Sequence, residues 1–219
     1  MKRTISIRLD TTQDQEKLLL QLQEAYHSAC NQIVPEVVTS RCWNRVALHQ
    51  LVYTKIRLTS PLGSQMVCNA IYSVSRTCRL VLQHPNSPLN IAKRPGSALP
   101  LLIFGPNSPV YFDRHTLSVK DEKLSMYTLD GRMHFQLALQ PEGEARFHRE
   151  KLLEIVLSRT AQGFQLVFSF SPDGALEGQA LPADSSAEFP EYLIVRPGIV
   201  TPETTPGLSN EDARESAMP

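Results

Sequence analysis

Lysine and arginine recur along most of this 219-residue chain, with aromatic side chains between them. Cationic side chains bind phosphate groups, and aromatic rings such as those of Tyr53, Tyr72, Tyr111 and Phe112 can stack on bases. The sequence therefore predicts a nucleic-acid-binding surface, although a solvated basic face over aromatic core residues would have the same composition. The basic candidates are Lys2, Arg3, Arg8, Arg41, Arg45, Lys55, Arg57, Arg76, Arg79, Lys93, Arg94, Arg114, Lys120 and Arg132.

No residue pattern predicts an active site in residues 1–190. Carboxylate pairs occur at 121–122 and 142–144, in predicted turns where such side chains are normally solvated. There is no HExxH, no GxSxG and no glycine-rich phosphate loop. We therefore predict no catalytic residue, no metal ligand and no cofactor in this part of the chain.

Charge is distributed unevenly along the sequence. Residues 1–170 contain 20 Lys and Arg against 13 Asp and Glu, a net charge of +7. Residues 171–219 contain 2 against 9, a net charge of −7. A basic body with an acidic tail favours a polyanionic partner for the body.

The overall composition is that of an ordinary globular protein, with 42% hydrophobic and 20% charged residues. No stretch approaches the roughly 20 apolar residues that span a bilayer, so we expect a soluble protein of the prokaryotic cytoplasm or nucleoid. The cysteines have no CxxC spacing, and we expect reduced thiols in helix cores at Cys30, Cys42, Cys68 and Cys78.

Hydrophobic periodicity predicts one strand followed by three helices. Residues 4–10 alternate apolar and polar side chains, as a half-buried strand does. The helix over 11–34 begins with a capping box at Thr12 and Gln15 and ends near Pro35. Further helices are predicted over 45–60 and, with Ser64 as the cap, over 64–83. Their apolar stripes would pack together as a small bundle.

After a connecting loop at 84–100, the pattern becomes that of β-structure. A hairpin is predicted over 152–170 with its turn near Ala161–Gly163, and a last short strand over 192–195. We predict an α+β fold, with an oligonucleotide-binding-like antiparallel barrel made by 1–10 and 101–170, helices inserted at 11–94, and a linker, strand and disordered acidic tail at 171–219. The other predicted strands are 101–104, 109–112, 115–119, 123–129 and 132–139.

Several segments, in their order, resemble a known family. They are "MKRTISIRLDTTQDQEKLLLQLQEAYHSACNQIV", "HQLVYTKIR", "SQMVCNAIYSV" and "FDRHTLSVKDEKLSMYTLDGRMHFQLAL". Together they are similar to the N-terminal half of TnpB, a family of transposon-encoded, RNA-guided DNA nucleases related to compact type V CRISPR effectors. The similarity covers about residues 1–200.

This resemblance implies a wedge domain made of barrel strands and a recognition lobe made of the inserted helices. Together they would hold a guide-like RNA, the heteroduplex that it forms with a DNA target, and a short motif beside the target. The residues that would approach the duplex there are Tyr53, Ser64, Gln65 and Asn69. An ordinary helix-surface or capping role is the alternative for each of them.

The segment "LIVRPGIV" (193–200) resembles the first strand of the family's RuvC-like nuclease domain. Gly198, Ile199 and Val200 match, but Arg196 stands where that strand carries a metal-binding aspartate. Two-metal hydrolysis needs carboxylates to hold its cations, and a guanidinium would repel them. About twenty residues follow in this sequence, so we expect the nuclease domain to be missing.

Three hypotheses follow. The chain is a non-cleaving, RNA-guided nucleic-acid-binding protein; or it is the binding subunit of a split nuclease whose catalytic half is a separate chain; or it is a decayed transposon remnant or protein-interaction module that binds no nucleic acid.

Overall fold

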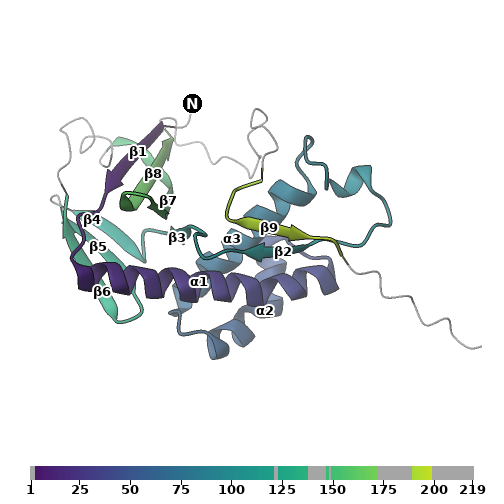
Figure 1. The fold of residues 1–219 in the computed structure, drawn as a ribbon, viewed down its shortest axis with the longest axis horizontal. Helices are drawn as coiled ribbons and strands as arrows, with labels where there is room; N and C mark the ends of the chain where they lie inside the picture. Colours follow the sequence, from purple (N-terminus) through teal and green to yellow (C-terminus); the bar gives the residue numbers. More distant parts are fainter. Residues whose placement is uncertain (1–2, 121–122, 138–146, 148, 172–188, 199–219) are drawn as a thin grey trace, which may run out of the picture.

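In the part of the chain that the computed structural model of this protein describes, three α-helices lie beside three antiparallel sheets (Figure 1). The structure describes residues 3–120, 123–137, 147, 149–171 and 189–198. The fold class is therefore α+β, as predicted. None of the helices within these ranges is both long and apolar enough to cross a membrane.

Helix α1 (Gln13–Ser40) begins at the predicted capping box, where the Gln15 backbone N–H donates to Thr12 Oγ1 and the Gln15 side chain accepts from the Thr12 N–H. The predicted end near Pro35 was wrong, because the helix continues for five residues beyond it. Val34 and Val37 are buried on either side of Pro35. Their burial favours the helical path although proline removes one hydrogen bond.

Helices α2 (Arg45–Thr59) and α3 (Ser64–Leu82) form a hairpin of helices that packs on α1. The N-cap of α3 is Gly63 and not Ser64, which is the first helical residue. On α2, Leu51 belongs to the apolar stripe at helical spacing, yet its side chain is 50% exposed. The predicted apolar face of α3 is confirmed, and its buried residues are Met66, Val67, Ala70, Ile71, Val74, Cys78 and Val81.

The largest sheet has the strand order β1-β8-β7-β3, with every neighbouring pair antiparallel. The first strand of the chain thus pairs with a strand from residues 163–171. The predicted hairpin between β7 and β8 is confirmed, with Gly163 at φ 109° supplying the turn. The four strands are β1 (Arg3–Arg8), β8 (Gly163–Ser171), β7 (Lys151–Thr160) and β3 (Val110–Phe112).

Two smaller sheets complete the described β-structure. One is the meander β4 (Leu117–Lys120), β5 (Lys123–Thr128) and β6 (Gly131–Gln136). The other pairs β2 (Leu101–Phe104) with β9 (Leu193–Arg196). A 3-10 turn, η1 (Ile91–Lys93), lies in the predicted loop between α3 and β2.

The predicted oligonucleotide-binding-like barrel is not confirmed for the strands that the structure describes, which do not close into one sheet. They form three separate sheets, and β2 pairs with β9 at the far end of the described chain instead of joining β1, β3, β7 and β8. Local periodicity predicts where a strand lies, but its partner is set by packing between distant segments. The predicted tail is outside the described residues from 199 onward.

At each end of the β2–β9 pair, a glycine allows two backbone segments to approach closely. A Cβ added to Gly198 would lie 2.2 Å from the Leu99 carbonyl oxygen, and one added to Gly105 would lie 2.9 Å from that of Tyr192. Both are closer than a side chain tolerates. The Gly198 that matches the nuclease-strand pattern is thus required here by a close approach of two backbone segments.

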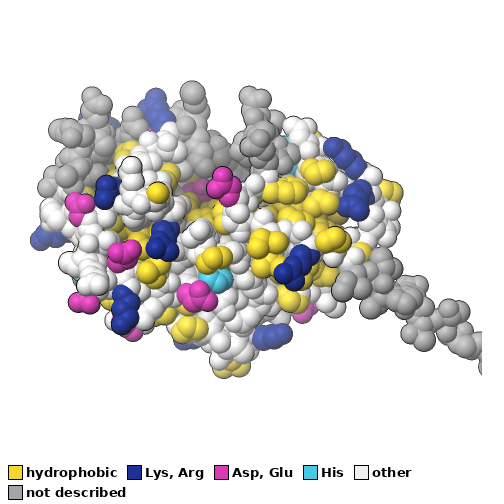
Figure 2. Space-filling model, in the orientation of Figure 1, with side chains coloured by type: hydrophobic (Ala, Val, Ile, Leu, Met, Phe, Trp, Pro, Cys, Tyr) yellow, Lys and Arg dark blue, Asp and Glu magenta, His cyan; other side chains and the backbone are white. Residues whose placement is uncertain are grey.

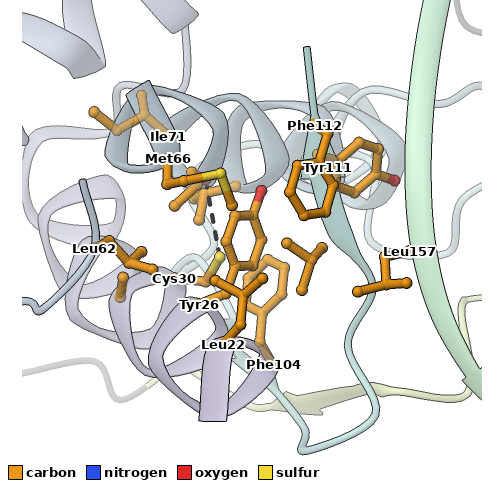
Figure 3. Close-up of a cluster of buried hydrophobic side chains, with 14 of the residues drawn as sticks. Leu22, Tyr26, Cys30, Leu62, Met66, Ile71, Phe104, Tyr111, Phe112 and Leu157 are labelled. Carbon is orange, nitrogen blue, oxygen red and sulfur yellow. Dashed lines mark hydrogen bonds between the residues drawn. The ribbon is translucent and has the colours of Figure 1, made fainter. Parts of the chain in front are cut away.

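The core lies where α1 meets α3, β2 and β3 (Figure 3). The ring of Tyr26 from α1 is fully buried among Met66 and Ile71 of α3 and Phe104 and Tyr111 of the strands. This joint core packs α1 and α3 against β2 and β3.

Candidate nucleic-acid interface

Two rows of side chains face each other where α2 and α3 pack together. Residues four apart on a helix lie on the same face, and each helix contributes one such row. The row on α2 consists of Arg45, His49, Tyr53 and Arg57. The row on α3 consists of Ser64, Cys68, Tyr72 and Arg76. We call these eight residues the α2–α3 seam, and each of them is exposed or half-buried.

Cationic side chains of α2 contact α3 at both ends of this seam. The Arg45 guanidinium lies over the Tyr72 ring, 5.2 Å from its centroid. Near the other end, Arg57 Nε donates a hydrogen bond to Ser64 Oγ over 3.2 Å. Both arginines are exposed, so each retains solvent-facing N–H donors that can contact phosphate.

The middle of the seam is aromatic. The His49 and Tyr53 rings stack with centroids 4.6 Å apart and an interplanar angle of 19°. His49 Nε2 lies 3.7 Å from Cys68 Sγ. Burial raises the pKa of the Cys68 thiol against the opposing effect of the Arg45 charge. A neutral thiol is a weak nucleophile, so this pair favours packing and not covalent chemistry.

A polar cluster ties the last residue of the seam to the large sheet. Arg76 Nε lies 3.4 Å from Glu154 Oε1, and its Nη1 donates to the Tyr111 hydroxyl over 3.1 Å. The Tyr72 hydroxyl donates to the same Glu154 oxygen. A β-bulge at Leu153 immediately precedes Glu154 on β7, and bulges commonly re-aim a side chain. Arg76 is therefore occupied in fixing α3 to β7 and β3.

Gln65 and Asn69 contact protein groups in a tight turn. Gln65 Nε2 donates to the Asp113 carboxylate, and Asn69 Nδ2 lies 3.4 Å from Thr116 Oγ1. Asn69 is buried. The Asp113 carboxylate also accepts the Thr116 N–H within this turn. These two amides hold the start of α3 to the β3–β4 connection, beside the seam.

The remaining basic candidates are dispersed. Arg3 forms an ion pair with Glu150, with 3.0 Å between Nη1 and Oε1. Arg8 lines a surface hollow that also contains Asp10 and Glu16, which makes it a poor site for an anion. Arg79 is half-buried on α3, and Lys2 is outside the described residues. Exposed but outside the seam are Arg41, Lys55, Lys93, Arg94, Arg114, Lys120 and Arg132.

The structure therefore places Arg45, Tyr53, Arg57 and Ser64 along the α2–α3 seam and leaves most other basic candidates outside it. On the face drawn in Figure 2, basic and acidic side chains are interspersed, and no single basic patch covers it. On this face, any contact with nucleic acid has to be local, because the face is not wholly basic.

His49 and Cys68 were not among the sequence-predicted ligands. The sequence could have indicated them, because His49 and Cys68 occur at the same four-residue spacing as the predicted residues on each helix. That spacing places them on the same helix faces. In the part of the chain that the structure describes, no three His, Cys, Asp or Glu side chains are grouped so that they could hold a metal ion. The chain matches no protein-family model and no curated protein.

Proposed function

We propose that this protein binds a guide-like RNA through the α2–α3 seam, and through base pairing of that RNA binds DNA, without cutting either. The observation that carries the proposal is the alternation of guanidinium groups and rings along one strip: Arg45, Tyr72, Tyr53 and Arg57. Guanidinium groups bind phosphates, and rings offer stacking faces that accept any base.

The rigidity of the strip supports this proposal. Backbone and phosphate recognition needs cations that hold their positions before the ligand arrives. The seam is anchored below by the buried face of α3 and at its end by the Arg76–Glu154–Tyr111 cluster. Within the seam, Arg45 lies over the Tyr72 ring and Arg57 donates to Ser64, so both guanidinium groups have protein contacts before a ligand binds.

The non-cleaving part of the proposal is supported by Arg196. This residue is the exposed last residue of β9, the strand that resembles the start of a nuclease domain. In the family that the sequence resembles, this strand holds divalent cations through a carboxylate. A guanidinium at the same place disfavours such cations. Incubation with Mg²⁺ or Mn²⁺ should leave labelled RNA and DNA intact, and appearance of defined cleavage products would refute this part.

The binding part is tested by fluorescence anisotropy with a labelled RNA hairpin. The double variant R45A/R57A should weaken binding by about tenfold or more, because two phosphate contacts are lost. Arg159→Ala is the matched control, because Arg159 is an exposed arginine near the end of β7 and is not one of the eight seam residues. Equal affinities for all three proteins would overturn the proposed site. Sequencing of RNA that co-purifies with the chain would identify the ligand.

A second candidate, the binding subunit of a split nuclease, is favoured by one feature of β9. Ile194 is 52% exposed on this strand and lies opposite Ile103 of β2. Ile103 is itself only half-buried, so the two paired side chains form a small apolar patch that another polypeptide could cover. Formation of a stable complex with a separately encoded catalytic chain would support this candidate, and Ile194→Asp should then weaken that complex.

A further inference from the structure

The β4–β5–β6 sheet presents a polar face opposite its apolar one. Residues alternate in this sheet, so Leu124, Met126, Met133 and Phe135 are buried on one side. None of the residues in these three strands is acidic. The residues on the other face that matter here are Ser118, Ser125, Tyr127, Arg132 and His134.

Tyr127 and Arg132 pair across β5 and β6, and together we call them the Tyr127–Arg132 platform. The guanidinium lies 4.3 Å from the centroid of the tyrosine ring. Its Nη1 donates to Ser125 Oγ and its Nη2 to the His115 carbonyl oxygen, each over 3.0 Å. Tyr127 is nevertheless 40% exposed. A large ring is thus exposed at the surface beside a guanidinium that two hydrogen bonds hold in place.

Such a platform has the chemistry of a base-stacking site. An exposed ring beside a fixed cation offers π-stacking and cation–π attraction to a flat base. Beside it, Ser118, Ser125 and His134 form a polar row that crosses the three strands in register. Hydroxyl and imidazole groups can bond to a ribose 2′-hydroxyl, which both donates and accepts.

The residues at the other end of this polar face give weaker evidence for binding of RNA. Lys120 and Lys123 pair there across β4 and β5, and the two residues between them in the sequence are acidic. Cations next to carboxylates are a weak indication of phosphate binding. The Tyr127 end carries the inference.

This platform is connected to the α2–α3 seam through one turn. Arg132 bonds to His115, which lies in the turn whose Asp113 and Thr116 contact Gln65 and Asn69 of α3. The platform and the start of α3, which carries one end of the seam, are therefore both attached to the same short segment. One RNA molecule with a paired and an unpaired part could contact both.

We propose that the Tyr127–Arg132 platform stacks an unpaired base of a single-stranded RNA segment. This inference rests on the proposed function, because it takes RNA as the ligand of the seam. It adds a second contact with a different chemistry: the seam contacts phosphates of the folded part, whereas the platform contacts a base outside it.

The test uses the full chain and two RNA hairpins that differ only in a short unpaired extension. Tyr127→Ala should weaken binding of the extended hairpin by about 5- to 100-fold, the range for losing one stacked base. Binding of the blunt hairpin should change less than twofold. Tyr127→Trp should restore binding of the extended hairpin, since it retains a stacking ring.

The outcomes separate the two proposals. If wild type binds neither hairpin, the proposed function itself fails. If wild type binds both and Tyr127→Ala leaves the extended hairpin unaffected, or weakens both equally, the platform is overturned while the seam stands. A DNA extension of the same sequence that binds as tightly as the RNA extension would overturn the assignment to RNA.

Discussion

The two faces of α3 have different roles, although their residues alternate along the same nineteen-residue helix. Ile71 is fully buried in the joint core, whereas its neighbour Tyr72 is half-exposed in the α2–α3 seam. Burial of the first face supplies stability, and the second is left to contact a ligand. We therefore expect substitutions on the buried face to change the free energy of unfolding, and substitutions on the seam face to change RNA affinity.

The largest effect is expected from Ile71→Ala. Removing a fully buried isoleucine leaves a cavity and should lower the free energy of unfolding by about 2–5 kcal/mol. Urea denaturation followed by circular dichroism measures this loss. RNA affinity of the fraction that remains folded should be unchanged. A variant that keeps wild-type stability would show that α3 is not part of the joint core.

A smaller effect on stability is expected at high pH. Burial raises the pKa of the Cys78 thiol from 9.0 to about 12. The unfolded thiol ionises first, so this contribution to stability is fully present below pH 9 and is lost as pH rises toward 12. Each such group lowers the free energy of unfolding by up to about 1.4 kcal/mol per pH unit in that window. Urea titrations at several pH values measure the slope.

The matched control for this pH dependence is Cys78→Ala. Its cavity lowers stability by an amount that does not depend on pH, whereas the slope above pH 9 should become shallower. Identical slopes in the two proteins would contradict a buried, neutral thiol. In the native protein, a thiol reagent should label Cys42 before Cys78, because Cys42 is only half-buried.

Glu154→Gln should have an intermediate effect on both the free energy of unfolding and RNA affinity. It removes the charge that faces Arg76 at the end of the seam, where the glutamate side chain is 12% exposed. Loss of a charged partner in a largely buried site should cost about 1–3 kcal/mol of stability. RNA affinity should also change, because Arg76 and Tyr72 lose a common anchor. Thermal denaturation and anisotropy together test this, and no change in either would exclude an anchoring role.

The smallest effect on stability is expected from Tyr53→Ala on the seam face of α2. Because Tyr53 is half-exposed, the free energy of unfolding should change by about 1 kcal/mol or less. RNA affinity should fall by about fivefold or more if the ring stacks on a base. Tyr53→Phe, which retains the ring, is the control and should bind as wild type does. Loss of stability without loss of binding would assign Tyr53 to packing.

Local features of this fold were predictable from the sequence because they depend on neighbouring residues. The capping box at Thr12 and Gln15, the buried face of α3 and the glycine turn at Gly163 are all short-range patterns. Pro35 was misread for the same reason. Its local cost was visible in the sequence, whereas the burial of the flanking residues comes from distant elements.

Long-range pairings could not be predicted in this way. The pairing of β2 with β9 joins segments about ninety residues apart and replaces the expected closed barrel. In the candidate site, the spacing of Arg45, Tyr53 and Arg57 indicated one helix face. No local pattern showed that Gln65 and Asn69 contact Asp113 and Thr116.

The most direct test of the account is the salt dependence of RNA binding by wild type and R45A/R57A. A contact with phosphate releases counterions, so the logarithm of the association constant falls with the logarithm of salt concentration. If both seam arginines contact phosphates, the slope of the variant should be shallower by roughly two. An unchanged slope, with or without a change in affinity, would contradict the claim that the α2–α3 seam binds the nucleic-acid backbone.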